Sequence, residues 1–302
     1  MIQPDGLDKK IVKEMLSPAS LQWNVRQSFH NIAKRLEVDE DTVRRRVERM
    51  RKAGFLRGWQ IIVNPHLIGC EAASFDLEIA KSDAATRTVS DLKLVPGVVN
   101  ILLFYGGRLR IMTYYRSEEA LGRQIALMES ICGSKHTMLW RPVFPPWDSK
   151  MSSTDWSIVA TLLDENPRRK LSSIASDAGV SSRTLNRRIT RMMGGYAFFL
   201  DADVDLSKLG GSAFALLVQY DDVSKKGQID HRILERVGSM SWTNTTASMH
   251  SMFVTHCENV VDGERLYRWV GGLDGIGQTR MGIIQEKITV KDWLSEELES
   301  RA

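Results

Sequence analysis

The chain has 302 residues, enough for two to four modest domains, and its 43% hydrophobic and 26% charged residues are typical of a globular protein. Its 41 Lys and Arg residues against 37 Asp and Glu leave a net charge of +4, which is too small to identify a nucleic-acid binder by itself. The three cysteines lack a C-x-x-C spacing, which argues against disulfides and zinc fingers, and no secretory leader or membrane-length apolar run is present, which predicts a cytoplasmic protein without a membrane partner.

Residues 1–68 are predicted to form a first winged helix-turn-helix domain. Three helices are expected at about 7–16, 28–36 and 40–52, and the tight turn "LEVDED" joins the second and third. The second helix carries Ala33, whose small side chain allows another helix to approach closely, and the third helix is basic. A glycine turn and an apolar, β-prone run, "RKAGFLRGWQIIV", then predict a wing hairpin.

Residues 69–148 are predicted to form a ferredoxin-like βαββαβ sandwich domain. Its elements are expected, in order, in the segments "CEAASFDLEIA", "TRTVSDLKLV", "VVNILLFY", "LRIMTYY", "SEEALGRQIALMESI" and "KHTMLWRPVF". The Pro- and Trp-rich linker "WRPVFPPWD" closes the domain. Its prolines prevent a continuous helix or central strand, and its aromatic residues favour a semi-rigid spacer packed between two halves of the chain over a solvated linker.

The second half of the chain repeats the first. The segment "NIAKRLEVDEDTVRRRVERM" (31–50) aligns without gaps on "SIASDAGVSSRTLNRRITRM" (173–192). Upstream, "LDKKIVKEML" resembles "TDWSIVATLL", and each is introduced by an acidic residue. Residues 149–209 are therefore predicted to form a second winged helix-turn-helix domain, and residues 210–302 a second ferredoxin-like domain with a C-terminal tail. The predicted fold class is α+β.

Four segments carry a resemblance to the Lrp/AsnC (feast/famine) family of transcriptional regulators: "LDKKIVKEML", "IAKRLEVDEDTVRRRVERM", "GFLRGWQIIVNP" and "VPGVVNILLFYGG". Members of this family usually hold one copy per chain and dimerise back to back through their α+β domains. The resemblance implies a tandem-duplicated regulator, a pseudo-dimer in one polypeptide, that binds double-stranded DNA. It also implies a small-molecule effector and homo-oligomers, formed through the ferredoxin-like domains, as candidate partners.

The third helix of each three-helix unit is the candidate DNA reader. At about 100° per residue, Val43, Val47 and Met50 mark its buried face, and an Arg- and Thr-rich face lies opposite. Arginine can bind guanine or phosphate, and threonine can reach a base edge or a backbone oxygen. With the basic wing included, the candidate DNA-binding residues are Thr42, Arg44, Arg45, Arg46, Arg49, Arg51, Lys52, Arg57, Ser182, Arg183, Thr184, Arg187, Arg188 and Arg191.

The alternative to DNA contact is that the charged faces of these helices are solvent-exposed and form salt bridges with neighbouring residues along the helix. The first helix supports it, since Asp41 can pair with Arg45, and Arg44 with Glu48, at i,i+4 spacing. The second helix has no acidic residue from 180 to 195. Its arginines are therefore predicted to lack local partners and to bind DNA more strongly than those of the first helix. Its wing region, "MGGYAFFLDADV", lacks the basic residues of the first.

An effector site and a metal site are the other binding hypotheses. In Lrp/AsnC regulators the loop between the second and third strands of the α+β domain commonly carries Gly and Asp. Here it reads "FYGGRLR", without the Asp, and a plain hairpin turn is favoured over an effector site. His250 and His256 are six residues, about 20 Å, apart on a predicted strand, too far for one ion, so no metal is predicted. The candidate effector-binding residues are Tyr105, Gly106, Gly107 and Arg108.

Siroheme decarboxylases, which also look like paired Lrp-type halves, provide the alternative function. They typically show an H-N-Y-x-R-like stretch after "PGV", whereas "PGVVNILLFYGGRLR" contains no His. No nucleotide-binding or hydrolase motif is present either, so the sequence predicts no enzyme, no catalytic residues and no cofactor. A third hypothesis is that the chain is a non-specific architectural DNA binder, or a subunit that recruits another protein.

Overall fold

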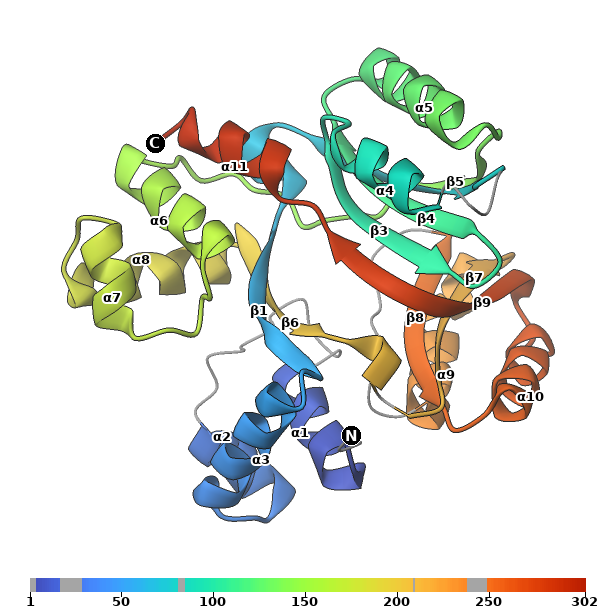
Figure 1. The fold of residues 1–302 in the computed structure, drawn as a ribbon, viewed down its shortest axis with the longest axis horizontal. Helices are drawn as coiled ribbons and strands as arrows, with labels where there is room; N and C mark the ends of the chain where they lie inside the picture. Colours follow the sequence, from blue (N-terminus) through green and yellow to red (C-terminus); the bar gives the residue numbers. More distant parts are fainter. Residues whose placement is uncertain (1–3, 17–28, 81–84, 209, 238–248) are drawn as a thin grey trace.

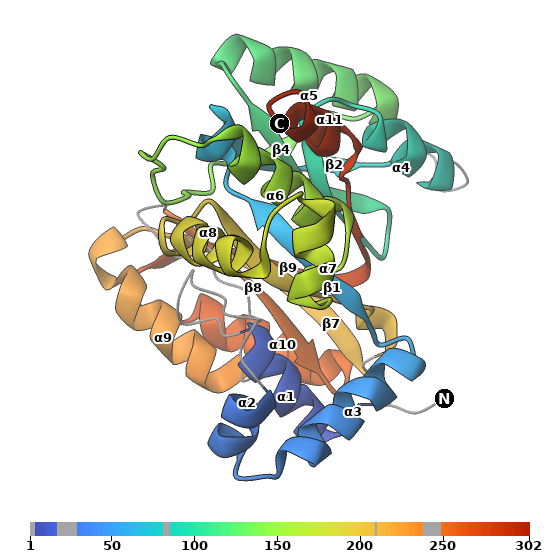
Figure 2. The same cartoon turned by 90° about the vertical axis from the view of Figure 1, so that its left-hand side faces the viewer.

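A computed structural model describes residues 4–16, 29–80, 85–208, 210–237 and 249–302. Two three-helix units lie on one side of the molecule, a short β-ribbon runs between them, and a large curved sheet fills the other side (Figure 1). Figure 2 shows both units facing the viewer. No helix in the described ranges is long and apolar enough to cross a bilayer.

The helices of the first three-helix unit have the predicted bounds to within about one residue. Each third helix begins at a capping side chain: Asp39 accepts from the Thr42 N–H at 2.7 Å, and Ser181 accepts from the Thr184 N–H at 3.1 Å. Such caps accept hydrogen bonds from the first backbone N–H groups of the helix, which have no acceptor within the helix. The helices are α1 (Gly6–Leu16), α2 (Phe29–Leu36) and α3 (Glu40–Lys52) in the first unit, and α6 (Ser153–Asp164), α7 (Leu171–Asp177) and α8 (Ser182–Gly194) in the second.

The predicted wing hairpin is wrong. The run after α3 forms a single strand, β1 (Leu56–Val63), which pairs antiparallel with β6 (Phe198–Val204) from the other half of the chain. A short 3-10 turn follows each strand: η1 (Pro65–Ile68) after β1 and η3 (Leu206–Lys208) after β6. Neither strand is therefore followed by a second strand that would complete a hairpin within its own half. Because strand backbone groups need hydrogen-bond partners, each strand takes the other as its partner.

The first α+β unit has the predicted βαββαβ order, and the described part of the second is consistent with it. The described strands of these two units form one antiparallel sheet in the order β5-β2-β4-β3-β9-β7-β8. The expected strand "WTNTTAS" lies outside the described residues. The first unit contains β2 (Glu71–Glu78), α4 (Ala85–Lys93), β3 (Val98–Phe104), β4 (Arg108–Tyr115), α5 (Glu118–Cys132) and β5 (Thr137–Trp140). The second contains β7 (Ser212–Tyr220), the 3-10 turn η4 (Val223–Lys225), α9 (Lys226–Val237), β8 (His250–Cys257), α10 (Val260–Gly271) and β9 (Ile276–Thr289).

Strand β9 joins the two α+β units. Its first part pairs with β7, and its last part, from Ile284 to Thr289, pairs with β3 of the other unit. A further helix, α11 (Asp292–Glu299), follows in the segment expected to be a tail. It packs against α6, and its Leu294 and Leu298 are buried. The last strand and helix of the chain therefore hold its two halves together.

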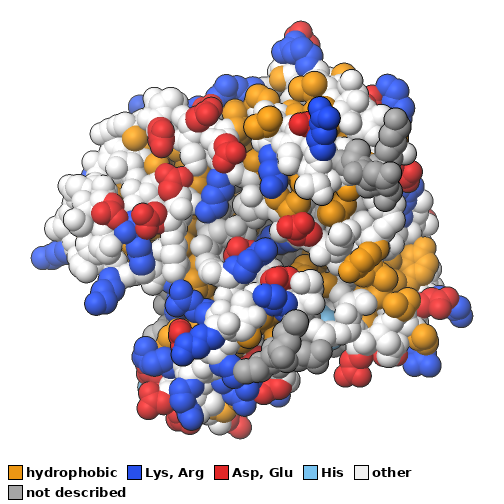
Figure 3. Space-filling view, viewed as in Figure 1, with side chains coloured by type: hydrophobic (Ala, Val, Ile, Leu, Met, Phe, Trp, Pro, Cys, Tyr) orange, Lys and Arg blue, Asp and Glu red, His pale blue; other side chains and the backbone are white. Residues whose placement is uncertain are grey.

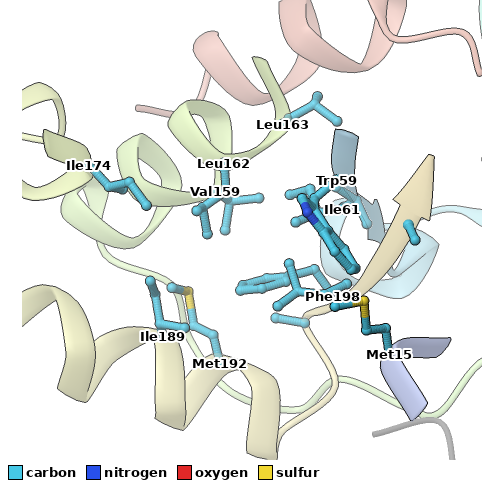
Figure 4. Packing of buried hydrophobic residues seen from close by; sticks show 14 of the residues in the cluster. Met15, Trp59, Ile61, Val159, Leu162, Leu163, Ile174, Ile189, Met192 and Phe198 are labelled. Atoms are coloured by element: carbon cyan, nitrogen blue, oxygen red, sulfur yellow. The ribbon is translucent and has the colours of Figure 1, made fainter. Parts of the chain in front are cut away.

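A single hydrophobic core runs through both three-helix units and the ribbon between them (Figure 4). Trp59 of β1 and Phe198 of β6 lie at its centre, with Met15 of α1 on one side and Leu162 and Met192 of the second unit on the other. Nonpolar surface from both halves is thus removed from water together, and this burial favours a fixed arrangement of the two units.

The Pro- and Trp-rich linker packs between the halves, as predicted. The Phe144 ring lies 6.3 Å from the Tyr114 ring of β4 and 6.2 Å from the Phe199 ring of β6. Asn64 donates a hydrogen bond from Nδ2 to the Pro145 carbonyl at 2.9 Å. Backbone carbonyls and aromatic rings of the linker therefore contact both the ribbon and the sheet.

Candidate nucleic-acid interface

Two arginines of α3 are held by acidic residues at the start of α1. Arg46 Nη1 lies 2.6 Å from Asp5 Oδ2 and 3.2 Å from Asp8 Oδ1. Arg49 forms ion pairs with the same two carboxylates, 3.1 Å from Asp5 Oδ2 and closer to Asp8, which is fully buried. The hydrogen bond from Arg46 is the main cause that lowers the pKa of Asp5 below its ordinary value. These contacts fix α3 against α1.

The second unit contains the same arrangement of ion pairs between its third helix and the start of its first helix. Asp155, at the start of α6, accepts from Arg188 Nη1 and from Arg191 Nη2, each at 2.7 Å. Asp155 also closes a capping box with Ser152. Burial acts to raise the pKa of this carboxyl, but hydrogen bonds from Ser152 and the two guanidinium groups hold it well below its ordinary value.

These contacts explain part of the sequence repeat. Arg46 and Arg49 match Arg188 and Arg191 in the aligned helices, and each pair binds the acidic residue at the start of its own unit. The arginines at 188 and 191 therefore have partners, although none lies in the local window from 180 to 195. The sequence did contain the signal, because Asp8 and Asp155 occupy the same place in the aligned first helices.

The repeated threonine also has a structural role. The Thr42 hydroxyl donates to Asp39 Oδ2 at 2.7 Å, and the Thr184 hydroxyl lies 3.0 Å from the Ser181 hydroxyl. Both threonines thus belong to the cap of their helix. Capping accounts for their identity in the two copies without a contact to DNA.

Arg45 and Arg187 are the matching arginines that no ion pair explains. Both are exposed, and neither forms an ion pair with any described residue. Arg45 Nη2 donates to the Thr42 hydroxyl at 3.1 Å and its Nε lies 3.4 Å from the Asp41 carbonyl. Arg183, one turn before Arg187, is likewise exposed and without a described ion pair.

The predicted i,i+4 pairs of the first helix are wrong in detail. Arg44 Nη2 pairs with Glu40 at 2.8 Å instead of with Glu48, and Arg45 forms no pair with the Asp41 side chain. The Arg44–Glu40 pair is exposed, and exposed pairs of this kind contribute only about 0.3–0.5 kcal/mol. Arg44 therefore remains able to exchange its partner for a phosphate.

The basic residues at the end of α3 and in β1 differ in their contacts. Arg57 Nη2 lies 2.9 Å from Asp203 of the other ribbon strand, so this guanidinium ties β1 to β6. Arg51 lies 3.7 Å from Glu48, whereas Lys52 is exposed and has no ion pair within the described ranges. On the second unit Ser182, the first residue of α8, is exposed.

Helices α3 and α8 differ in charge at the end where each begins. Helix α3 starts with Asp39, Glu40 and Asp41, whereas the described start of α8 has two serines and Arg183. Figure 3 shows Lys and Arg side chains interspersed with acidic ones over the α1–α3 unit. Carboxylates near a phosphate backbone oppose binding, so α8 has the more favourable charge for DNA.

The candidate effector residues form a hairpin turn between β3 and β4. Gly106 and Gly107 have φ values of 90° and 83°, a backbone region that glycine enters without strain. Arg108 turns back over the Phe104 ring, 4.3 Å from its centroid, and lines a surface cleft of about 530 Å³. Tyr105 and the two glycines do not line that cleft, so the four residues do not converge on one pocket.

His250 and His256 lie at opposite ends of β8. The ring of His250 is 6.0 Å from the Trp140 ring, while His256 hydrogen bonds to the Gly210 carbonyl. Burial lowers the pKa of both imidazoles, which favours their neutral form. Within the described residues, no group of three or more His, Cys, Asp or Glu side chains is arranged to hold a metal ion.

The helix and strand order described above has a counterpart among known DNA-binding domains, since residues 5–57 match the winged helix-turn-helix DNA-binding family. The match covers helices α2 and α3 and supports a helix-turn-helix in the first unit. The chain is 27% identical to the HTH-type transcriptional regulator Ptr1 of Methanocaldococcus jannaschii, over 45% of this chain and 92% of that protein. It is also 27% identical to the regulatory protein AsnC of Haemophilus influenzae, over 42% of this chain and 85% of that protein.

A solved structure shares the architecture over nearly the whole chain. The siroheme decarboxylase NirDL superposes with a TM-score of 0.56, covering 97% of both chains at 12% sequence identity. At this identity the likeness concerns the fold. Homologues named as transcriptional regulators therefore match less than half of the chain each, while the arrangement of both halves is also found in an enzyme.

Proposed function

We propose that this chain is a DNA-binding transcriptional regulator of the Lrp/AsnC type, with α3 and α8 as two readers in one polypeptide. The observation that carries the proposal is the pair Arg45 and Arg187. They occupy the same position on equivalent helices, both are exposed, and no described ion pair accounts for their identity. The sequence match of residues 5–57 to DNA-binding domains and the names of the homologous regulators support it.

Eight of the candidate residues fall into two roles under this proposal. Arg183 and Arg187 on α8, and Arg45 and Lys52 on the first unit, would contact bases or phosphates directly. Arg46, Arg49, Arg188 and Arg191 would position the readers, because their guanidinium groups bind Asp8 and Asp155. A reader fixed to its own unit loses less conformational entropy on binding. The partner is double-stranded DNA, and the chain then acts as an intramolecular pseudo-dimer.

The second candidate is a siroheme-decarboxylase-like enzyme, which the fold likeness over 97% of both chains favours. Two surface clefts of about 530 and 550 Å³ have no histidine among their described lining residues. The stretch after "PGV" also lacks histidine. An imidazole is the usual proton donor near neutral pH, so this reading has less support than DNA binding.

Equilibrium binding of the purified chain separates the two functions. Labelled random-sequence duplex DNA, titrated at several salt concentrations, is expected to bind with an affinity that falls steeply as salt rises, because bound phosphates release counterions. In parallel, an iron tetrapyrrole is added and its visible absorption spectrum recorded. A shifted spectrum at stoichiometric tetrapyrrole, together with no DNA binding in dilute buffer, would favour the enzyme over the regulator.

A further inference from the structure

Two adjoining cavities lie between the β1–β6 ribbon and the sheet. Their volumes are about 90 and 50 Å³. An engineered apolar cavity of about 150 Å³ is large enough to bind benzene, so these spaces are on the scale of a small organic molecule. Both are lined by Asn100, Met112, Asp201 and Lys287.

Asp201, which lines both cavities, has one carboxylate oxygen without a hydrogen-bond donor in the described part of the chain. It is 1% exposed, and its Oδ2 accepts from Gln60 Nε2 at 3.1 Å and from Lys287 Nζ at 2.8 Å. Its Oδ1 is buried and has no hydrogen-bond partner among the described residues. A buried carboxylate oxygen left without a donor costs about 1–3 kcal/mol or more, so a donor placed there would be bound favourably.

The other walls of the larger cavity are mostly apolar. Val99, Phe144, Phe199 and Leu294 line it, and the hydroxyl of Tyr114, which also lines it, already donates to the Val63 carbonyl at 2.7 Å. A molecule in this space would therefore bury an apolar body against these side chains. Each CH₂ group transferred from water to such a site contributes about 0.8 kcal/mol.

The charges around the cavity select against a cation. Lys287 pairs with Asp201, and Lys291 also lines the larger cavity, with its ammonium 2.6 Å from the Leu163 carbonyl. The Lys287 ammonium therefore already balances the charge of the Asp201 carboxylate. A second cation brought to Asp201 would be repelled by Lys287, whereas a neutral hydroxyl or amide N–H meets no such repulsion.

We propose that this cavity binds a neutral, compact apolar molecule whose single hydroxyl or N–H group donates to Asp201 Oδ1. The ligand would contact the ribbon and the sheet at once, since Asp201 belongs to β6 and Lys287 to β9. The proposal is independent of the DNA-binding function, and its test contains no DNA.

Cyclohexanol and cyclohexanone are suitable probes, because they have the same ring and size but only the alcohol can donate. Titration calorimetry or NMR of the full chain is expected to show about tenfold tighter binding of the alcohol. In Asp201→Asn the side-chain oxygen can keep the bonds from Lys287 and Gln60, and an NH₂ donor then replaces the acceptor Oδ1. This variant is therefore expected to prefer the ketone.

Val99→Phe, which fills the larger cavity, is expected to abolish binding of both probes. Circular dichroism checks that each variant is folded, and if Asp201→Asn is not, the alcohol-to-ketone ratio of the wild type and the loss in Val99→Phe decide the outcome. The proposal is overturned if the wild type binds neither probe, which would mean that the cavity takes only water. It is also overturned if a folded Asp201→Asn keeps the preference for the alcohol, or if a folded Val99→Phe binds both probes unchanged.

Discussion

Replacing Arg183 and Arg187 together by alanine is expected to weaken binding to duplex DNA by at least about tenfold at fixed salt, or about 1.4 kcal/mol. Both side chains are exposed, and neither has an ion pair among the described residues that would compete with DNA. Each arginine that binds a phosphate adds about one to the slope of log affinity against log salt, so the double variant should reduce that slope by about two. Fluorescence anisotropy titrations between about 50 and 200 mM salt measure both quantities.

A matched control removes the same charge elsewhere. Arg87 on α4 and Arg232 on α9 are exposed on helices of the α+β units, and replacing both by alanine is expected to leave the salt slope unchanged. Arg45→Ala should have a smaller effect than the double change on α8, because acidic residues flank the start of α3. An affinity loss in the control equal to that in Arg183→Ala with Arg187→Ala would show that only net charge matters.

Asp76→Ala is expected to lower the free energy of unfolding by about 3–5 kcal/mol. Arg110 donates to Asp76 from Nε at 2.7 Å and from Nη2 at 3.0 Å, and the two side chains are 4% and 1% exposed. Arg110 Nη1 also lies 3.5 Å from the Met252 sulfur of the other α+β unit. Removing the carboxylate would leave a guanidinium charge buried where the two units meet.

The double variant Asp76→Leu with Arg110→Met tests this explanation. Replacing both charges by apolar side chains of similar size removes the unpaired charge, so most of the stability should return. Urea unfolding followed by circular dichroism compares the single and double variants. Equal destabilisation in both would mean that packing, and not the unpaired charge, causes the loss.

The elements of the fold were largely predictable from local sequence. The predicted third helix at 40–52 matches α3 at both ends, because its apolar spacing and its capping residue lie within the helix and its immediate flank. The ferredoxin-like order followed for the same reason, since alternating and helical apolar patterns are short-range signals. The helix α11 was missed, because its few turns are stabilised by contact with α6, more than 120 residues away.

The pairing of β1 with β6 and the roles of the arginines were not predictable in this way. Both depend on contacts between residues far apart in the chain: Arg57 with Asp203, and Arg191 with Asp155. A window limited to i,i+4 neighbours identifies Arg191 as unpaired. The sequence repeat could have identified these partners. In both units an acidic residue at the start of the first helix accompanies the two arginines of the third helix.

Selection of bound sequences from a pool of random duplex DNA tests most directly whether one chain holds two readers. The arrangement of α3 and α8 around one shared core predicts an enriched site with two half-sites at a fixed separation. Because the two helices differ in sequence, the half-sites should differ as well. Enrichment of a single half-site, or no enrichment above the starting pool in dilute buffer, would contradict the account.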